Sequence, residues 1–334
     1  MIKFDQPKVI AEIADAHYGS LERAKRMAFL AKEAGCDYAK FQHHLPEFEM
    51  LRDIPMSANM REPLYDFLKK NALTIEEHVA LRDHCNSIGI EYLCTPFSRE
   101  AALELETYVS PNLYKIGSGE LTDLPTLGIV AGFKKPMIVS TGMSDVSEID
   151  ETYNFLVDKV PQLVLMNCTS AYPPKASDIF LSFIPIMKDR YPKAIIGHSD
   201  HMPSIHTSLG AVALGSMLVE KHVTIDSTLE GPDDSVSITF DEMAKLVKGV
   251  KEIFDGLNSD KRLLESEIPI QQWARRSLVY LRDLPAGSIL SKDDIWGKRP
   301  GTGVPAKFYE QVVGKTLKIA VKKDTLLYPE DLEA

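Results

Sequence analysis

The stretch KVIAEIADAHYGSLERAKRMAFLAKEAGCDYAKFQH, residues 8–43, contains a complete strand, helix and strand unit. Residues 8–14 and 37–43 are apolar runs of strand length. Between them, residues 21–35 space their apolar side chains along one face of a helix, and Gly35 is suited to end that helix. Two strands separated by a helix predict a parallel pair joined by a crossover connection.

Short apolar stretches of strand length recur up to residue 223, and helical patterns follow them. The eight predicted strands are 8–14, 37–43, 90–96, 113–118, 136–141, 162–169, 193–198 and 217–223. A closed barrel of eight such units takes about 250 residues. The chain has 334 residues, which leaves room for one small addition. We therefore predict an α/β fold, a (β/α)8 TIM barrel followed by a small β-rich domain.

The alternation of strands and helices stops after the helical pattern at 240–257. We predict that the barrel spans 1–258 and that the polar, charged stretch 259–273 is a linker. Residues 274–334 contain two weakly similar halves, each with an apolar strand, a charged turn and a short apolar segment. This pattern is typical of a small β-rich module.

The composition excludes several classes of partner. The chain carries 38 Lys and Arg against 48 Asp and Glu, a net charge of −10 with neutral histidines. Binding to nucleic acid or to an anionic membrane needs clustered basic residues, so neither is expected. No apolar run approaches the roughly 20 residues of a membrane-spanning helix, and residues 1–8 lack the apolar core of a signal peptide. We expect a cytoplasmic protein.

The four cysteines are Cys36, Cys85, Cys94 and Cys168. They form no CxxC pair and mostly lie in apolar segments, which indicates reduced thiols in a core rather than disulfides or a metal site.

Polar residues stand at the ends of nearly all predicted strands. In a barrel these ends meet at one open face, where the loops build the active site. The residues are Lys40, Gln42 and His43; Thr95; Lys115, Ser118 and Glu120; Ser140 and Thr141; Thr169, Ser170 and Tyr172; His198, Ser199, Asp200 and His201; and Glu220, Lys221 and His222. Their repetition predicts one polar site at this face.

Lys40 and Lys115 lie in apolar strands, where an unpaired ammonium is costly to desolvate, so each needs an anionic partner. That partner is either a neighbouring glutamate or a bound anion. The tripeptides GSG at 117–119, STG at 140–142 and CTS at 168–170 offer hydroxyl and backbone donors suited to phosphate oxygens. Together with the lysines they favour a phosphorylated substrate.

His201 and His222 end neighbouring predicted strands and can offer imidazole nitrogens to one divalent cation. Two histidines leave positions for water and substrate, which suits an exchangeable Mn²⁺, Mg²⁺ or Co²⁺. Either histidine can instead be structural, and His198 competes with His201 as the ligand from its strand. Glu120 follows a glycine-flanked turn, where a carboxylate can exchange protons with a substrate or be an ordinary surface group.

Several motifs resemble the sialic acid synthase family, in the family's order and over nearly the whole chain. They are IAEIADAHYGS at 10–20, AKFQ at 39–42, CTPFS at 94–98, YKIGSGE at 114–120, STGM at 140–143, GHSDH at 197–201, EKHVT at 220–224 and GPDDSVS at 231–237. The tail motifs LPAGSIL, WGKRPGTGV and VVGKTL are similar to the antifreeze-like (SAF) domain that follows the barrel in that family.

The resemblance implies condensation of phosphoenolpyruvate with an N-acylated six-carbon amino sugar, giving a nine-carbon 2-keto acid and phosphate. It implies a divalent metal, typically Mn²⁺, that activates the open-chain aldehyde of the sugar. It also implies a domain-swapped homodimer, in which the tail domain of one chain reaches over the barrel of the other.

The resemblance further implies a role for each matching residue. Glu120 matches the catalytic glutamate, and His201 and His222 match the metal ligands. The residues that match positions holding phosphoenolpyruvate are Lys40, Thr95, Lys115, Ser118, Ser140 and Ser199, and we expect Ser170 beside them. Asn59, Tyr172, Asp233 and the tail residue Arg299 match positions around the sugar, and we expect Tyr18 and Gln42 beside them.

Two positions depart from the family pattern. Tyr18, in AHYG, stands where the family has NHNG or NHEG, and Ser170 stands where an asparagine is common. Both changes concern substrate contacts, so the acceptor stays open between N-acetylmannosamine and a 2,4-diacetamido-trideoxy sugar. A tyrosine hydroxyl and ring at position 18 suggest a deoxy sugar.

Two other functions remain as alternatives. One is a related synthase that joins phosphoenolpyruvate to a phosphorylated aldose, although no spare arginine cluster is seen at the strand ends. The other is a barrel without catalysis that binds a carbohydrate, although such a barrel has no need of Glu120 and both histidines.

Overall fold

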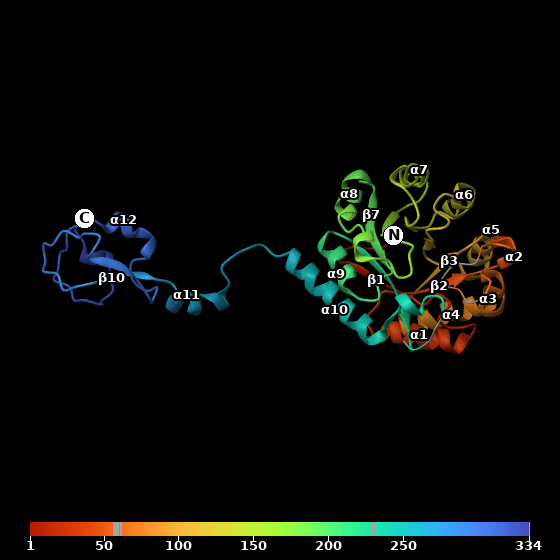
Figure 1. The fold of residues 1–334 in the computed structure, drawn as a ribbon, viewed down its shortest axis with the longest axis horizontal. Helices are drawn as coiled ribbons and strands as arrows, with labels where there is room; N and C mark the ends of the chain where they lie inside the picture. Colours follow the sequence, from red (N-terminus) through yellow and green to blue (C-terminus); the bar gives the residue numbers. More distant parts are fainter. Residues whose placement is uncertain (56–59, 61, 227, 229–230, 334) are drawn as a thin grey trace. The chain divides into compact units, whose positions relative to one another are not determined.

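The computed structural model describes residues 1–55, 60, 62–226, 228 and 231–333. Contacts divide the chain into two compact units, Met1–Ser259 and Asp260–Ala334 (Figure 1).

The first unit is a barrel of parallel strands with helices around it (Figure 1). Its neighbouring strands follow the order β3, β2, β1, β8, β7, β6, β5, β4, and β3 and β4 contact each other at the closing seam. The strands are β1 Lys8–Glu12, β2 Tyr38–His43, β3 Glu91–Pro96, β4 Tyr114–Ile116, β5 Met137–Ser140, β6 Leu163–Cys168, β7 Ala194–Asp200 and β8 Leu218–Thr224. All eight strands predicted from the sequence are confirmed, and so is the barrel.

Helices follow the strands, as the apolar spacing predicts. They are α1 Leu21–Glu33, α2 Pro46–Glu49, α3 Leu64–Asn71, α4 Ile75–Ile88, α5 Arg99–Glu104, α6 Leu124–Gly132, α7 Val146–Leu156, α8 Phe183–Arg190, α9 His206–Ala213 and α10 Phe240–Leu257. Ser20 begins α1 by accepting from the backbone N–H of Arg23. Gly35 follows the end of α1 with a φ of +87°, a left-handed conformation that ends helices.

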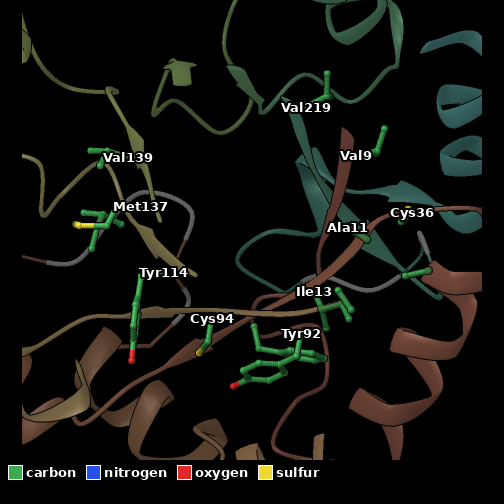
Figure 2. Close-up of a cluster of buried hydrophobic side chains, with 14 of the residues drawn as sticks. Val9, Ala11, Ile13, Cys36, Tyr92, Cys94, Tyr114, Met137, Val139 and Val219 are labelled. Carbon is green, nitrogen blue, oxygen red and sulfur yellow. The ribbon is translucent and has the colours of Figure 1, made fainter. Parts of the chain in front are cut away.

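Successive residues of each strand face opposite sides of the barrel wall. Val9, Ala11 and Ile13 pack outward in the large core between strands and helices (Figure 2). Ile10 belongs to a second cluster, inside the barrel, with residues such as Leu93 of β3. Because side chains on one face recur every second residue, the positions two residues beyond this inner layer also face inward, nearer the carboxyl ends of the strands.

The second unit has a small β-rich core of its own. Strands β10 Ser277–Tyr280 and β11 Ile295–Lys298 pair antiparallel, and isolated bridges join further segments. Its core includes Leu278, Tyr280, Leu317 and Leu327. The unit also contains α12 Tyr309–Val312, and the stretch predicted as a linker holds most of α11 Ile268–Ala274.

The four cysteines are buried and unpaired, as expected of core thiols. None of the helices in the described part of the chain has the length and apolar character needed to cross a bilayer.

Candidate active site

A cavity of about 440 Å³ lies at the carboxyl ends of the barrel strands. Its walls contain inward-facing residues that follow the inner apolar layer, such as Glu12 two residues after Ile10 and Thr95 two residues after Leu93. Among its lining residues are these predicted site residues: Lys40, Gln42, Thr95, Lys115, Ser118, Glu120, Ser140, Ser170, Tyr172, Ser199, His201, His222 and Asp233. The alternation of strand side chains therefore brings together groups that are far apart in the sequence.

The two lysines share carboxylates at the base of this cavity. The Nζ atom of Lys40 lies 2.9 Å from Oε2 of Glu12 and 3.0 Å from Oε1 of Glu220, and Lys115 Nζ lies 3.1 Å from the same Glu220 oxygen. The side chains of both lysines are at most 4% exposed. The glutamate partners considered from the sequence are therefore present, and the lysines also line the cavity.

Burial and ion pairing shape the protonation of this cluster. Burial opposes ionisation of Glu220, but the ammoniums of Lys115 and Lys40 outweigh it and hold the pKa of Glu220 below its ordinary value. Burial lowers the pKa of Lys115, because its charge is compensated only in part by Glu220. A bound anion would complete that compensation.

Two buried hydroxyls in the cavity wall have no hydrogen-bond partner among the described residues. They are Oγ1 of Thr95, on a residue 1% exposed, and Oγ of Ser140, on a residue 2% exposed. A buried polar group without a hydrogen-bond partner lowers the free energy of unfolding by about 1–3 kcal/mol. Such groups are therefore usually found where a ligand binds or where the structure is strained. Both hydroxyls line the same cavity as the lysines, which fits a ligand with oxygen acceptors.

Gly142, in the loop after β5, lies against two more hydroxyls of the cavity wall, those of Ser118 and Ser170. The backbone N–H of Gly142 donates to Oγ of Ser118 over 3.1 Å. A Cβ atom at position 142 would overlap Oγ of Ser170 and lie 2.8 Å from Oγ of Ser118. Only glycine at this position lets the two serine hydroxyls approach the chain so closely.

Glu120 has the properties of a proton-exchanging group. Burial, followed by the nearby charge of Glu49, raises its pKa to about 7. Its Oε2 atom is buried and has no hydrogen-bond partner among the described residues. A carboxyl with this pKa is present in both protonation states near pH 7, which suits general acid and base chemistry.

The two predicted metal ligands lie side by side. The ring centroids of His201 and His222 are 5.4 Å apart. His201 Nδ1 lies 2.7 Å from the carbonyl oxygen of Thr169, so Nδ1–H donates to it. When the ring is neutral, Nε2 carries the free electron pair, and it lies 3.2 Å from the hydroxyl of Tyr172. Burial lowers the pKa of His201, but Cys168 and the carbonyl of Thr169 outweigh burial and raise that pKa above its ordinary value.

His222 is buried and its pKa lies well below 6.5, first because of burial and then because of the charge of His201. A neutral imidazole is the form that binds metals. His222 Nδ1 lies 3.6 Å from Oδ2 of Asp233. No group of three or more His, Cys, Asp or Glu side chains arranged to hold a metal occurs in the described ranges. The proximity of the two rings fits a cation held by two imidazoles, with its other positions open to water and substrate.

The structure separates His198 from His201. His198 Nδ1 lies 3.0 Å from the carbonyl oxygen of Asn167, and His198 is absent from the cavity wall. His201 lines the cavity. Of the two histidines that spacing alone leaves open as the ligand from this strand, His201 is the one that faces the cavity.

Tyr18 contacts the loop that carries Asp233 rather than the cavity itself. Its hydroxyl donates to Oδ2 of Asp234 over 2.7 Å, and the backbone N–H of Gly231 donates to the same oxygen over 2.7 Å. The guanidinium of Arg23 lies over the Tyr18 ring at 5.1 Å. Tyr18 therefore ties together the first and last loops at the open face of the barrel.

Comparison with known proteins identifies the family of this chain. Residues 27–262 match the NeuB family, and residues 275–333 match the SAF domain. The chain belongs to the NeuB family. It is 33% identical to the N,N'-diacetyllegionaminic acid synthase of Legionella pneumophila, over 98% of this chain and 94% of that one. It is an enzyme, a synthase of the transferase class.

Other relatives extend the comparison. The human N-acetylneuraminate-9-phosphate synthase is 32% identical, with 96% of this chain and 91% of that one covered. The crystal structure of the N-acetylneuraminic acid synthetase of Leptospira borgpetersenii, in complex with citrate, is similar with a TM-score of 0.72 and 29% identity. That comparison covers 80% of this chain and 90% of the other.

Of the remaining predicted sugar residues of this NeuB-family chain, one lies outside the described residues and one belongs to the second unit. Asn59 lies outside the described residues. Arg299 is in the SAF unit, exposed to solvent, where its Nε atom donates to the carbonyl oxygen of Ala274 over 3.1 Å. Its guanidinium lies 5.4 Å from the centre of the Trp273 ring.

The cavity also contains groups that the sequence reasoning did not assign to the site: Glu12, Asp15, His44, Glu49 and Cys168. Glu12 could have been predicted from the sequence, because it is an acidic residue at an inward position of the first predicted strand. For His44 and Glu49 there was no such signal, because both follow β2 in a connection without strand or barrel periodicity.

Proposed function

We propose that this NeuB-family chain condenses phosphoenolpyruvate with an N-acylated amino hexose to give a nine-carbon 2-keto acid and phosphate. One observation carries the proposal. The charge-sharing lysines Lys40 and Lys115 and the unpartnered hydroxyls of Thr95 and Ser140 surround one cavity, which also holds Glu120.

The lysines and hydroxyls would hold the phosphate and carboxylate oxygens of phosphoenolpyruvate, with Ser118, Ser170 and Ser199 beside them. Donors fixed in this way orient C3 of the enol toward the acceptor, which lowers the entropic part of the barrier. The bond between C3 and the sugar aldehyde carbon forms first. Positive charge then develops at C2, where the carboxylates of Glu12 and Glu220 stabilise it.

Glu120 would move the protons. In its protonated form it donates to the aldehyde oxygen as the carbon–carbon bond forms, and as a carboxylate it then takes a proton from the water that adds to C2. The hydroxyl formed at C2 passes its proton to the departing phosphate as the C2–O bond breaks, which leaves the ketone and free phosphate. A pKa of about 7 lets one carboxyl serve both steps.

His201 and His222 would hold a divalent cation, Mn²⁺ in the first instance and Mg²⁺ or Co²⁺ otherwise. When bound, it supplies a Lewis acid that polarises the sugar aldehyde. The expected result for His222→Ala is loss of bound Mn²⁺ in a metal titration and loss of turnover, with an unchanged circular dichroism spectrum. Full activity in metal-stripped buffer would contradict the metal role.

The acceptor is proposed as N-acetylmannosamine or a 2,4-diacetamido-trideoxy hexose, with Tyr172, Gln42 and Asp233 around it. Because the hydroxyl of Tyr18 is used by Asp234, Tyr18 offers no free donor to a sugar hydroxyl in this arrangement. We expect higher kcat/KM for the trideoxy sugar. A strong preference for N-acetylmannosamine would reject this choice.

The decisive experiment is phosphate release from phosphoenolpyruvate in the presence of Mn²⁺ and a panel of acceptors. We expect release with N-acyl amino hexoses. Release only with phosphorylated aldoses would replace the proposal by a related synthase, and binding of a sugar without release would indicate a carbohydrate-binding barrel.

We further propose that the active form is a domain-swapped homodimer, in which Arg299 of one chain recognises the N-acyl group of the sugar in the barrel of the other. An arginine provides several N–H donors suited to the acyl carbonyl oxygen.

A further inference from the structure

His44 and Glu49 form a buried pair in the cavity wall that the proposed reaction does not use. His44 follows β2 directly, and Glu49 is the last residue of α2. Their side chains are 5% and 10% exposed, and His44 Nδ1 lies 2.9 Å from Oε2 and 3.1 Å from Oε1 of Glu49. The imidazole also stacks on the ring of Phe97, with centroids 4.3 Å apart.

The pair is the outer end of a chain of hydrogen bonds into the site. His44 Nε2 lies 2.9 Å from Oε1 of Gln42. Gln42 Nε2 then donates to Oε1 of Glu12 over 2.7 Å, and the other oxygen of Glu12 lies 2.9 Å from Nζ of Lys40. Gln42, Glu12 and Lys40 all line the cavity.

The donors and acceptors along this chain can be counted. Burial raises the pKa of Glu12, and the ammonium of Lys40 opposes that effect. In the ionised form, paired with Lys40, Glu12 can only accept, so the amide nitrogen of Gln42 must face it. The amide oxygen of Gln42 then faces His44, whose Nε2 must carry a proton. Nδ1 faces the carboxylate of Glu49, which also only accepts. His44 therefore carries protons on both ring nitrogens.

We propose that His44, clamped by Glu49, is a positioning residue that fixes the amide of Gln42 and, through it, the carboxylate of Glu12 for the acceptor sugar. With the amide oxygen held by His44 and one N–H held by Glu12, the second N–H of Gln42 is the group left to contact a ligand. Without His44 the amide is free to rotate and can present an oxygen where a donor is needed. This inference rests on the proposed function.

The pair also affects the charge around Glu120. Glu120 faces Glu49, His44 and Lys115, and the charge of His44 opposes the effect of Glu49 on its pKa. His44 itself faces Glu49, Asp15 and Glu120, and these carboxylates raise its pKa against the effect of burial. His17 and His43 also lie near enough to feel the charge of His44. Removal of His44 thus leaves Glu49 uncompensated and raises the pKa of Glu120 further.

The test uses His44→Leu and His44→Ala in the full chain, with His84→Leu as the matched control. His84 is half-buried, and the one hydrogen-bond partner of its ring among the described residues is the carbonyl oxygen of Lys25. Loss of a charge-assisted hydrogen bond predicts a rise in KM for the sugar of about 10-fold or more in both His44 variants. KM for phosphoenolpyruvate should change less than about 3-fold, because Lys40 keeps its ion pairs.

Two further readouts separate positioning from simple packing. The limb of the pH profile that reports Glu120 should move to higher pH in His44→Leu. Added imidazole should restore activity to His44→Ala but not to His44→Leu, in which the leucine fills the site. Unchanged KM for the sugar and an unmoved pH limb in a folded His44→Leu would overturn the proposal.

A measurement on the wild-type protein does not depend on activity. Nitrogen-15 NMR of the histidine rings at pH 7, assigned by loss of the signal in His44→Leu, should show two N–H groups on His44. A ring with one N–H would overturn the inference even if the synthase reaction is confirmed. If no acceptor gives phosphate release in the wild type, the proposed function fails, while this ring measurement still tests the hydrogen-bond chain.

Discussion

At the scale of single residues, an unsatisfied hydroxyl is a cost that a ligand can offset. Thr95 and Thr152 are both 1% exposed, but Thr152 donates to the carbonyl oxygen of Leu121 over 2.8 Å and Thr95 has no partner among the described residues. We expect Thr95→Val to keep or raise the melting temperature of the unliganded protein, because valine has the same shape without the unsatisfied hydroxyl. The same variant should raise KM for phosphoenolpyruvate about 10-fold.

Thr152→Val is the control for this prediction. It removes a satisfied hydrogen bond, so it should destabilise the protein by about 1 kcal/mol and leave KM unchanged. Thermal unfolding and steady-state kinetics measure both effects. If Thr95→Val were as destabilising as Thr152→Val, the hydroxyl of Thr95 would be structural and not reserved for a ligand.

The residues of the site were predictable to the extent that they follow strand periodicity. Lys40, Thr95 and Lys115 stand at inward positions near the ends of apolar strands, so the pattern alone indicates where they point. Tyr18 and His44 stand in loops, where no period applies. Their partners, Asp234 and Glu49, depend on how the loops fold back, which the spacing of residues does not determine.

At the scale of elements, the loop after β5 depends on the absence of a side chain. A Cβ atom at Gly142 would overlap Oγ of Ser170 and crowd Oγ of Ser118. We therefore expect Gly142→Ala to displace both hydroxyls and to raise KM for phosphoenolpyruvate about 10-fold or more. The stability cost should be small, because the atoms that the new Cβ meets first are serine hydroxyls that can rotate away. Gly132→Ala in α6 is the control, because no atom lies within 4 Å of its added Cβ. Equal kinetics for the two variants would show that the serines do not hold substrate.

Neutral histidines packed around β2, α4 and the loop after β1 predict sensitivity to acid. Burial lowers the pKa of His17 to about 4 and that of His78 well below 6.5, and the charges of neighbouring histidines lower them further. Between pH 6.5 and 4 the unfolded chain binds protons that the folded chain does not. Stability is therefore complete above about pH 6.5 and falls with pH, by up to about 1.4 kcal/mol per pH unit for each group.

The raised pKa of His44 opposes this trend, because its contribution is present below pH 6.5 and is lost as the pH rises. His17 and His78 together should outweigh it. His78→Gln keeps an acceptor for the hydroxyl of Tyr92, which lies 2.8 Å from His78 Nδ1, but cannot titrate. We expect a smaller loss of unfolding free energy between pH 7 and pH 5 in this variant, measured with urea. An identical loss would contradict the assignment.

At the scale of the whole molecule, the sequence indicates two units because the alternation of strand and helix patterns stops after residue 257. The barrel has its own core, and the SAF unit has another, built around Leu278, Tyr280 and Leu317. The assembly of chains into oligomers cannot be predicted in the same way, because the surface residues that contact another chain do not recur at a regular spacing in the sequence. The exposed Arg299 is the residue through which assembly can be tested, since its proposed partner is a sugar bound in another chain.

Mixing two inactive variants tests this arrangement. Arg299→Ala keeps an intact barrel and His222→Ala keeps an intact tail, so each alone should have little activity. If the tail of one chain completes the barrel of the other, random reassociation makes half of the dimers mixed, each with one complete site, and restores roughly a quarter of wild-type activity. If each tail serves its own barrel, no mixture regains activity. His201→Ala mixed with His222→Ala is the control and should stay inactive, because both barrels are then defective.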